Sequence, residues 1–221
     1  MSLNVGELFK GIRARILSDE RQYGYRWPES IQLDSQPPED IDFQQITAEN
    51  VDLVQEWKDA PYAKQFPTLL NRGMTGLYAI REGRVIGFLW VTTRMRKWSP
   101  TILHGLLDVG DAMSGRAEVR PEYRRQKVGF YLHSEIQKLV RGVFGDQIKR
   151  MWGVTRIDNI PMQKLARSLG CTQCREHRVL VLLGTLFVCM TWDLVPDTTE
   201  RTGRGRLSLG IRVPEFLSSL M

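Results

Sequence analysis

The chain has 221 residues, of which 42% are hydrophobic and 25% are charged, and its formal net charge at pH 7 is +6. This length suits one ordinary domain with extensions, and the composition excludes a fibrous protein and a chain that is disordered throughout. No apolar run reaches the roughly 20 residues of a membrane-spanning helix, and residues 1–20 lack the apolar core of a secretory signal. We therefore expect a cytoplasmic protein with no membrane contact, whose positive charge would suit an anionic partner.

The cysteine content argues against both a disulfide framework and a metal site. The three cysteines are Cys171, Cys174 and Cys189. An odd number in a chain without an export signal predicts free thiols. Cys171 and Cys174 form a C-x-x-C pair, but zinc needs two more ligands and the three histidines are scattered. The sequence therefore predicts no metal.

The first forty residues differ in pattern from the rest. Apolar residues at near-helical spacing over 3–18 predict an amphipathic helix. The prolines and acidic residues over 21–42 favour an extended connector. We place a domain boundary near residue 40, so that 1–40 is an N-terminal helix with a connector, 41–196 is the main domain and 197–221 is a peripheral Gly/Arg-rich tail.

The domain is expected to begin with alternating short elements. A strand over 41–46 precedes a helix that begins at Val51 after a capping Asn50. Two β-rich runs flank Gly83, whose backbone freedom suits a hairpin turn. The next strand ends before Pro121, because proline cannot donate to a central ladder. The hairpin strands are 77–80 and 85–92, and the next strand is 113–119.

The second half of the domain continues the mixed pattern. Apolar residues over 128–144 follow one stripe of a helix, and 148–156 reads as another strand. A second helix has Pro161 in its first turn and ends at Gly170. The closing strand pair is expected at 177–183 and 186–192. The fold class is therefore α/β in the broad sense, with strands and helices in one domain.

The segment 118–130 joins a predicted core strand to the start of the long helix. The first turn of a helix exposes unpaired backbone N–H groups, and the helix dipole adds partial positive charge there. Arg124, Arg125 and Lys127 bring formal charge to the same place, and Gly129 lets a ligand approach the backbone. The segment therefore predicts an anion site that would fit a pyrophosphate.

This segment resembles the acyl-CoA-binding motif of the GNAT acetyltransferases, V-x-P-x-x-R-G-x-G-x-G. The residues in register are Val119, Pro121, Tyr123, Arg124 and Gly129. Residues 158–171 are similar to the second signature of the family, N-x-x-A-x-x-L-Y-x-x-x-G-F, at Asn159, Leu165 and Gly170. The order of the expected elements from about residue 41 to 194 also resembles the family.

The resemblance implies the GNAT fold, which has a mixed, mostly antiparallel central sheet, helices on both faces and a splay between the two central strands. It implies acetyl-CoA or CoA as the cofactor, with the backbone near Val119 paired with pantetheine and Asn159 beside the pantetheine arm. Arg124 would add charge to the pyrophosphate site. The backbone N–H groups implied to hold the pyrophosphate are those of Arg125, Gln126, Lys127, Val128, Gly129 and Phe130.

The sequence departs from the family pattern at three positions. Arg125 and Lys127 stand where the motif usually has glycine, so a β-carbon can crowd the ligand while the charge can meet its phosphates. Ala166 stands where many members have a tyrosine that protonates the departing thiolate. A water, Tyr131 or Cys171 would have to replace that tyrosine, and spacing does not choose among them.

The sequence also leaves the identity of the general base open. Glu118 lies on the strand beside the expected thioester and could accept a proton from an ammonium, or it could simply pair with Arg116 or Arg120. His133 is expected at the helix surface or boundary rather than in catalysis. Trp90 and Trp152 lie in strand runs and are expected in the core.

These features favour transfer of an acetyl or other acyl group from acyl-CoA to a primary amine of a small molecule or peptide. The family resemblance implies that the amine attacks directly in a ternary complex. The alternatives are a catalytically silent acyl-CoA-binding module and an acyltransferase that takes long chains from an acyl carrier protein. Nucleic acid is not an expected partner, because a cofactor's phosphates account for the main basic cluster. Edge strands could pair into a homodimer, as the family resemblance suggests.

Overall fold

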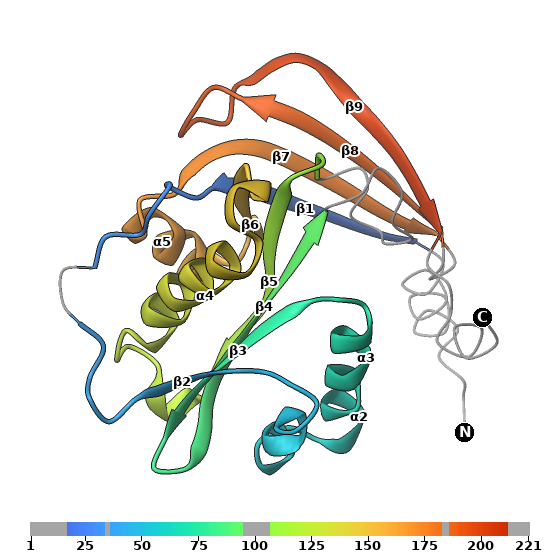
Figure 1. The fold of residues 1–221 in the computed structure, drawn as a ribbon. Helices are drawn as coiled ribbons and strands as arrows, with labels where there is room; N and C mark the ends of the chain where they lie inside the picture. The colour runs from blue at the N-terminus through green and yellow to red at the C-terminus, as the bar shows by residue number, and fades with distance from the viewer. Residues whose placement is uncertain (1–16, 34–35, 95–106, 183–185, 212–221) are drawn as a thin grey trace, which may run out of the picture.

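The computed structural model describes residues 17–33, 36–94, 107–182 and 186–211 (Figure 1). The strands are β1 (Leu17–Arg26), β2 (Asp42–Gln45), β3 (Thr75–Arg81), β4 (Arg84–Arg94), β5 (Asp111–Val119), β6 (Arg150–Arg156), β7 (Thr172–Leu182), β8 (Leu186–Leu194) and β9 (Arg201–Ile211). The α-helices are α2 (Ala60–Ala63), α3 (Gln65–Asn71), α4 (Val128–Phe144) and α5 (Ile160–Ser168). The 3-10 helices are η1 (Val51–Glu56), η3 (Pro121–Tyr123) and η4 (Gly145–Gln147).

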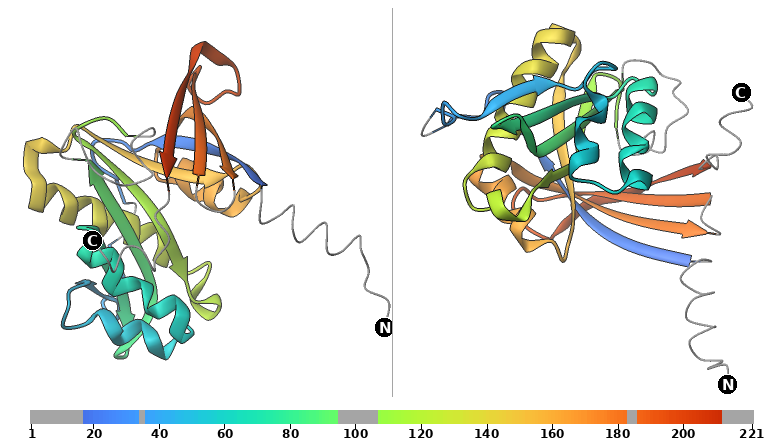
Figure 2. Two further views of the ribbon diagram at one scale, coloured as in Figure 1. Left: turned by 90° about the vertical axis from the view of Figure 1, so that its right-hand side faces the viewer. Right: turned by 90° about the horizontal axis from the view of Figure 1, so that it is seen from below.

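The described strands form one sheet in the order β2-β3-β4-β5-β6-β1-β7-β8-β9. Every neighbouring pair is antiparallel except β5 and β6, which run parallel. Figure 2 shows the strong twist of this sheet, which turns β7, β8 and β9 across the direction of β3 and β4. The mixed, mostly antiparallel sheet with helices confirms the fold class expected from the sequence.

Two hydrophobic cores lie on opposite faces of the sheet because side chains alternate along β3 and β4. Leu77 and Ala79 belong to the core that contains Leu132 and Ile136 of α4. Tyr78 and Ile80, the intervening residues, belong to the core built with η1 and α3. The helices therefore cover both faces, with α4 and α5 on one and η1 and α3 on the other.

The hairpin of β3 and β4 confirms the turn expected at Gly83. Glu82 and Gly83 both adopt positive φ, at 51° and 74°. Two successive residues with positive φ form the turn whose twist matches the flanking strands. The expected strand over 113–119, the long helix, the strand over 148–156, the second helix and the closing strand pair are likewise present as β5, α4, β6, α5 and the pair β7 and β8.

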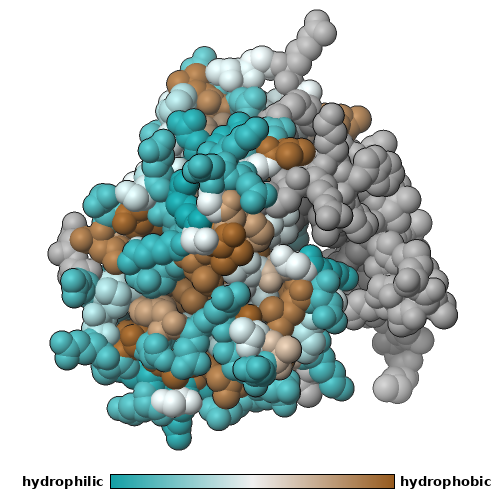
Figure 3. Space-filling model, in the orientation of Figure 1, coloured by the Kyte–Doolittle hydropathy of each residue, from teal (hydrophilic) through white to brown (hydrophobic). Residues whose placement is uncertain are grey.

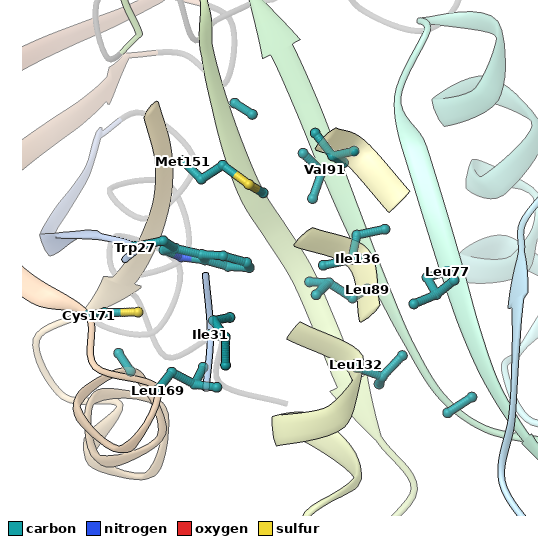
Figure 4. Packing of buried hydrophobic residues seen from close by; sticks show 14 of the residues in the cluster. Trp27, Ile31, Leu77, Leu89, Val91, Leu132, Ile136, Met151, Leu169 and Cys171 are labelled. Carbon is teal, nitrogen blue, oxygen red and sulfur yellow. The ribbon is translucent and has the colours of Figure 1, made fainter. Parts of the chain in front are cut away.

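The prediction of an extended connector over 21–42 is wrong for its first residues, because residues 17–26 form β1 inside the sheet. β1 pairs with β6 on one side and β7 on the other. The chain that follows it brings Trp27 into the core, where Figure 4 shows its ring beside Met151 and Ile31. The charged residues that argued for a connector find partners across strands: Arg21 donates to Glu176 of β7 at 2.6 Å.

The tail over 197–221, which was expected to be peripheral, also contains sheet structure. β9 pairs with β8 and forms one edge of the described sheet. Its Arg201 donates to Glu176 at 3.1 Å, so this glutamate is shared between β1 and β9. The helix expected over 3–18 lies outside the described residues except for its last two positions, which begin β1. The division of the chain near residues 40 and 196 stays a prediction.

The parallel pair β5 and β6 separates partway along its length. Its register runs from Asp111 opposite Arg150 to Ser114 opposite Gly153. Beyond this point β5 continues to Val119 beside β4, while β6 continues to Arg156 beside β1. The two strands therefore diverge toward their carboxyl ends, which is the splay that the sequence resemblance implied.

The surface on the side shown in Figure 3 is mostly hydrophilic, with apolar residues exposed in patches between polar ones. Large apolar residues with high exposure are few among the described residues, and two of them, Val143 and Ile160, lie on α4 and α5. Within the described ranges, no helix has the length and apolar character needed to cross a membrane.

Candidate functional site

The turn between β5 and α4 has the backbone geometry of a glycine-rich loop without the glycines. Arg125 and Lys127 adopt left-handed φ angles of 64° and 59°. This conformation costs an L-residue with a side chain roughly 1–2 kcal/mol, which explains why glycine is usual in such a turn. These two residues therefore adopt the backbone conformation that favours glycine, and they add two exposed cationic side chains to the loop.

This loop forms one wall of a cavity of about 750 Å³ between β5, α4 and α5. The lining residues come from the end of β5, the loop, the first turns of α4 and the start of α5. The predicted site residues that line it are Glu118, Val119, Arg124, Arg125, Lys127, Val128, Gly129, Phe130 and Asn159. The structure thus brings together residues that are up to 41 positions apart in the chain.

Gln126 is the predicted site residue that does not line the cavity. Its side chain accepts a hydrogen bond from Arg81 at 3.1 Å and donates one to Glu122 O at 3.0 Å. These contacts hold the loop against the β3–β4 hairpin. A side chain that bridges two turns is a local support that the sequence motif alone did not reveal.

The first turn of α4 faces the cavity with part of its backbone. Phe130 N–H donates to Lys127 O at 2.8 Å, so this predicted phosphate donor is already bonded inside the turn. Val128 and Gly129 occupy the first two helical positions, where an N–H group has no intrahelical acceptor. A β-carbon at Gly129 would meet Leu165 at 3.5 Å and Val119 at 3.8 Å, so glycine leaves space on the cavity side.

Val119 and Arg124 contact each other across the loop. Arg124 Nε donates to Val119 O at 3.2 Å, which occupies part of the backbone predicted to pair with pantetheine. Asn159 has a structural task as well, since its Oδ1 accepts the N–H of Met162 and caps α5. Val119, Arg124 and Asn159 all line the cavity while they order the elements around it.

The residues considered as substitutes for the missing tyrosine lie away from the large cavity. Ala166 and Cys171 line a smaller cavity of about 10 Å³ together with Trp27. Burial raises the pKa of the Cys171 thiol to about 12, so this group holds its proton at neutral pH. Tyr131 is buried and is absent from the described lining of both cavities.

His133 is buried, which corrects the expectation of a surface position. It is 2% exposed and lines both cavities, and Trp27 packs on its ring at a centroid distance of 5.3 Å. Its Nδ1–H donates to Gly129 O at 2.6 Å. Burial lowers the pKa of this imidazole to about 4, so His133 is neutral at physiological pH. Trp90 and Trp152 are buried as expected.

Glu118 lies just beyond the point where β5 leaves β6, on a strand that is bulged. Leu89 of β4 faces two residues of β5, Arg116 and Ala117, because Phe88 pairs with Glu118 and Trp90 pairs with Gly115. The Arg116 side chain donates to Gln65 of α3 instead of pairing with Glu118. A bulge leaves one residue outside the ladder and redirects the side chains that follow.

The partner of Glu118 is Lys58, rather than either arginine expected from the sequence. Lys58 Nζ donates to Glu118 Oε1, and the two side chains are 17% and 33% exposed. Arg120 turns away and donates to Val85 O at 2.6 Å. Lys58 follows η1, 60 residues before Glu118, so no local sequence pattern could have joined the two.

Residues 42–171, more than half of the chain, match the model of the acetyltransferase (GNAT) family. A Drosophila protein of known structure is 13% identical, with a TM-score of 0.55 over 83% of this chain and 59% of that one. A tandem GNAT protein from the clavulanic acid biosynthesis pathway is 13% identical, with a TM-score of 0.55 over 87% of this chain and 59% of that one.

A GNAT-family protein from Novosphingobium aromaticivorans is 15% identical, with a TM-score of 0.50 over 75% of this chain and 64% of that one. The chain thus spans less than two thirds of these three proteins. At such identities the likeness concerns the fold. A comparison with curated proteins gives no match.

Proposed function

Because the chain belongs to the GNAT family of acetyltransferases, we propose that it transfers an acetyl or another acyl group from acyl-CoA to a primary amine. The acceptor would be a small molecule or a peptide. The observation that carries the proposal is the cavity where β5 and β6 diverge, walled on one side by a cationic loop and the start of α4.

The residues around this cavity fit acyl-CoA in charge and in the space they leave. Arg125 and Lys127 would meet the phosphates with formal charge, while the N–H groups of Val128 and Gly129 and the dipole of α4 add to the attraction. Gly129 leaves the backbone open to a ligand. Asn159 and Val119 would flank the pantetheine arm. When bound, acyl-CoA would supply the activated thioester.

The residues of the chain would orient the two substrates, polarise the thioester carbonyl and remove a proton from the acceptor ammonium. The bulge at Arg116 and Ala117 frees backbone from the β4 ladder, and an N–H group there would bind the oxygen of the thioester carbonyl. Glu118 would accept the proton of the acceptor ammonium before attack. We assign reprotonation of the departing thiolate to water, since the methyl group of Ala166 has no acidic proton to donate and Cys171 lines the smaller cavity.

The setting of the enzyme is part of the same proposal. A cytoplasmic location would supply acyl-CoA and keep the thiols reduced. A second copy could pair along β2 or β9, the edges of the described sheet. Nucleic acid is not proposed as a partner.

The test is a panel of primary amines with acetyl-CoA, in which release of the CoA thiol is followed. We expect amine-dependent thiol release, reduced roughly 100-fold in Glu118→Gln because a general base contributes about that much. The matched control is Glu122→Gln, an exposed carboxylate four residues away. Binding of CoA with no amine-dependent release from any acceptor would instead support a silent acyl-CoA-binding module.

A further inference from the structure

Lys58 presents a primary ammonium to the candidate base from the chain itself. Its Nζ donates to Glu118 Oε1 and lies 4.3 Å from the ring centroid of Trp57 and 5.1 Å from that of Tyr62. A carboxylate and two aromatic faces are the groups that bind a primary ammonium in a partly desolvated site. This arrangement is what an external amine acceptor would need at the same place.

The location of this ammonium relative to the cavity follows from the alternation of β5. Val119 Cγ2 lies near the position of a β-carbon at Gly129, so the Val119 side chain faces α4. Successive strand residues point to opposite faces, which directs Glu118 to the side of η1 and α3. Glu118 also lines the cavity. Lys58 thus approaches from the opposite face, where the divergence of β5 and β6 opens the sheet.

We propose that Lys58 is an internal acceptor, which the chain acylates with its own acyl-CoA. This inference rests on the proposed function, because it uses the same cofactor and the same base. Glu118 accepts a proton from the Lys58 ammonium, and the neutral Nζ attacks the thioester carbonyl carbon. A C–N bond forms and the C–S bond breaks. After the attack the nitrogen loses a second proton, which water relays to the departing CoA thiolate, so CoA leaves as the thiol, the amide nitrogen keeps one hydrogen and Glu118 returns its proton to solvent.

Proximity to Glu118 distinguishes Lys58 from the other lysines among the described residues. Four of these lysines are exposed and lie elsewhere in the fold: Lys64, Lys138, Lys149 and Lys164. Lys138 pairs with Glu135 along α4 at 2.7 Å, and Lys127 lies at the loop end of the cavity. Lys58 contacts the candidate base directly, so its attack would be intramolecular and favoured by a high effective concentration.

Acylation would also change the site for other amines. The ammonium of Lys58 neutralises Glu118 and occupies the place where an acceptor ammonium would bind. An acylated Lys58 carries no charge and releases the carboxylate. The modification would therefore turn Glu118 from an occupied base into a free one.

The experiment incubates the full chain with isotope-labelled acetyl-CoA, and peptide mass mapping then gives the label at each lysine. We expect Lys58 to acquire label at least about tenfold faster than Lys64, at a rate constant that does not change with protein concentration. Glu118→Gln should slow labelling of Lys58 by roughly 100-fold and leave that of Lys64 unchanged. Lys58→Arg should abolish the modification, and Lys64→Arg is the matched control.

A second readout does not use the cofactor. Lys58→Gln, which resembles the acylated side chain, should lower the unfolding midpoint relative to Lys58→Arg, because only arginine keeps the ion pair with Glu118. Equal midpoints would show that the ion pair between Lys58 and Glu118 does not contribute to stability, and would contradict the coupling of the two side chains on which this inference rests.

The outcomes separate this inference from the proposed function. CoA binding and amine-dependent thiol release, with Lys58 labelled no faster than Lys64, would overturn self-acylation and leave the proposed function standing. Absence of CoA binding by the intact chain would overturn both. Labelling of Lys58 that survives Glu118→Gln at the full rate would overturn the assignment of the base and with it the internal acceptor.

Discussion

Arg125 and Lys127, which flank Gln126, share a left-handed backbone conformation in the loop that precedes α4. The family pattern has glycine at both positions, and a positive φ is a conformation that glycine adopts at little cost. The conformational cost falls on the backbone of two residues whose cationic side chains belong to the lining of the cavity. Strain at a turn of this kind is retained where the side chain has a use.

The first prediction separates charge from backbone geometry at Lys127. Lys127→Gly relieves the left-handed strain, and we expect the free energy of unfolding to rise by up to about 1 kcal/mol. Lys127→Ala removes the same charge but keeps the strain, so its unfolding free energy should stay near that of the original chain. Urea unfolding measures both, and both variants should bind CoA more weakly. A Gly variant less stable than the Ala variant would contradict the account.

Gly129 offers a variant that spares the fold and affects the ligand. A β-carbon there meets its nearest atom at 3.5 Å, an ordinary contact, and alanine is favoured over glycine in a helix by about 1 kcal/mol. Gly129→Ala should therefore leave thermal stability equal or higher. Its added methyl group stands where we place the approach of the pyrophosphate, so titration calorimetry should show weaker CoA binding. Unchanged affinity would mean that the ligand keeps away from this turn.

His133 predicts a pH dependence of stability. Because its folded pKa of about 4 lies below the ordinary 6.5, the unfolded chain binds more protons between these values. Stability should therefore fall as the pH falls from 6.5 toward 4, by at most about 3 kcal/mol. Glu176, whose pKa is lowered by Arg201 and Arg21 against the opposing effect of burial, contributes in the same direction.

The His133 contribution is isolated by a difference between variants. His133→Gln removes the titrating group, and its unfolding free energy should decrease less between pH 7 and pH 4.5 than that of the original chain. Urea unfolding at the two pH values gives the comparison. An equal decrease in both proteins would show that His133 is not held neutral by burial.

A substitution of Trp27 tests whether the segment before residue 40 belongs to the domain core. Its ring is 6% exposed and packs on His133. Trp27→Ala should lower the free energy of unfolding by about 3–5 kcal/mol, as expected for removal of a large core side chain. Arg26→Ala, at the exposed preceding residue, should change it by less than about 0.5 kcal/mol. Similar small effects at both positions would place this segment outside the cooperative unit.

The cofactor loop and the order of the domain's elements could be predicted because their signals are local. Gly83, Pro121 and Gly170 mark turns or ends, and the apolar stripe of α4 falls within one segment. The loop motif is likewise continuous in sequence. These features depend on neighbours a few residues away, which one sequence displays directly.

The position of β1 and the Lys58–Glu118 contact could not be predicted in this way, because each depends on distant residues. The charges at the start of β1 look unfavourable for an interior strand until Glu176 of β7 is placed beside Arg21. Tyr23, Tyr25 and Trp27 do alternate in the period of a strand, a signal that the nearby prolines and acids obscured. Lys58 reaches Glu118 only through the packing of η1 on the sheet.

The central claim is that the loop before α4 binds the phosphates of acyl-CoA, and calorimetric titration with acetyl-CoA and CoA tests it most directly. We compare the original chain with Lys127→Glu in the loop and Lys149→Glu, an exposed residue before β6 that makes the same change in net charge. Micromolar binding that is lost in Lys127→Glu and kept in Lys149→Glu is the predicted result. No binding by the original chain, or equal loss in both variants, would contradict the claim.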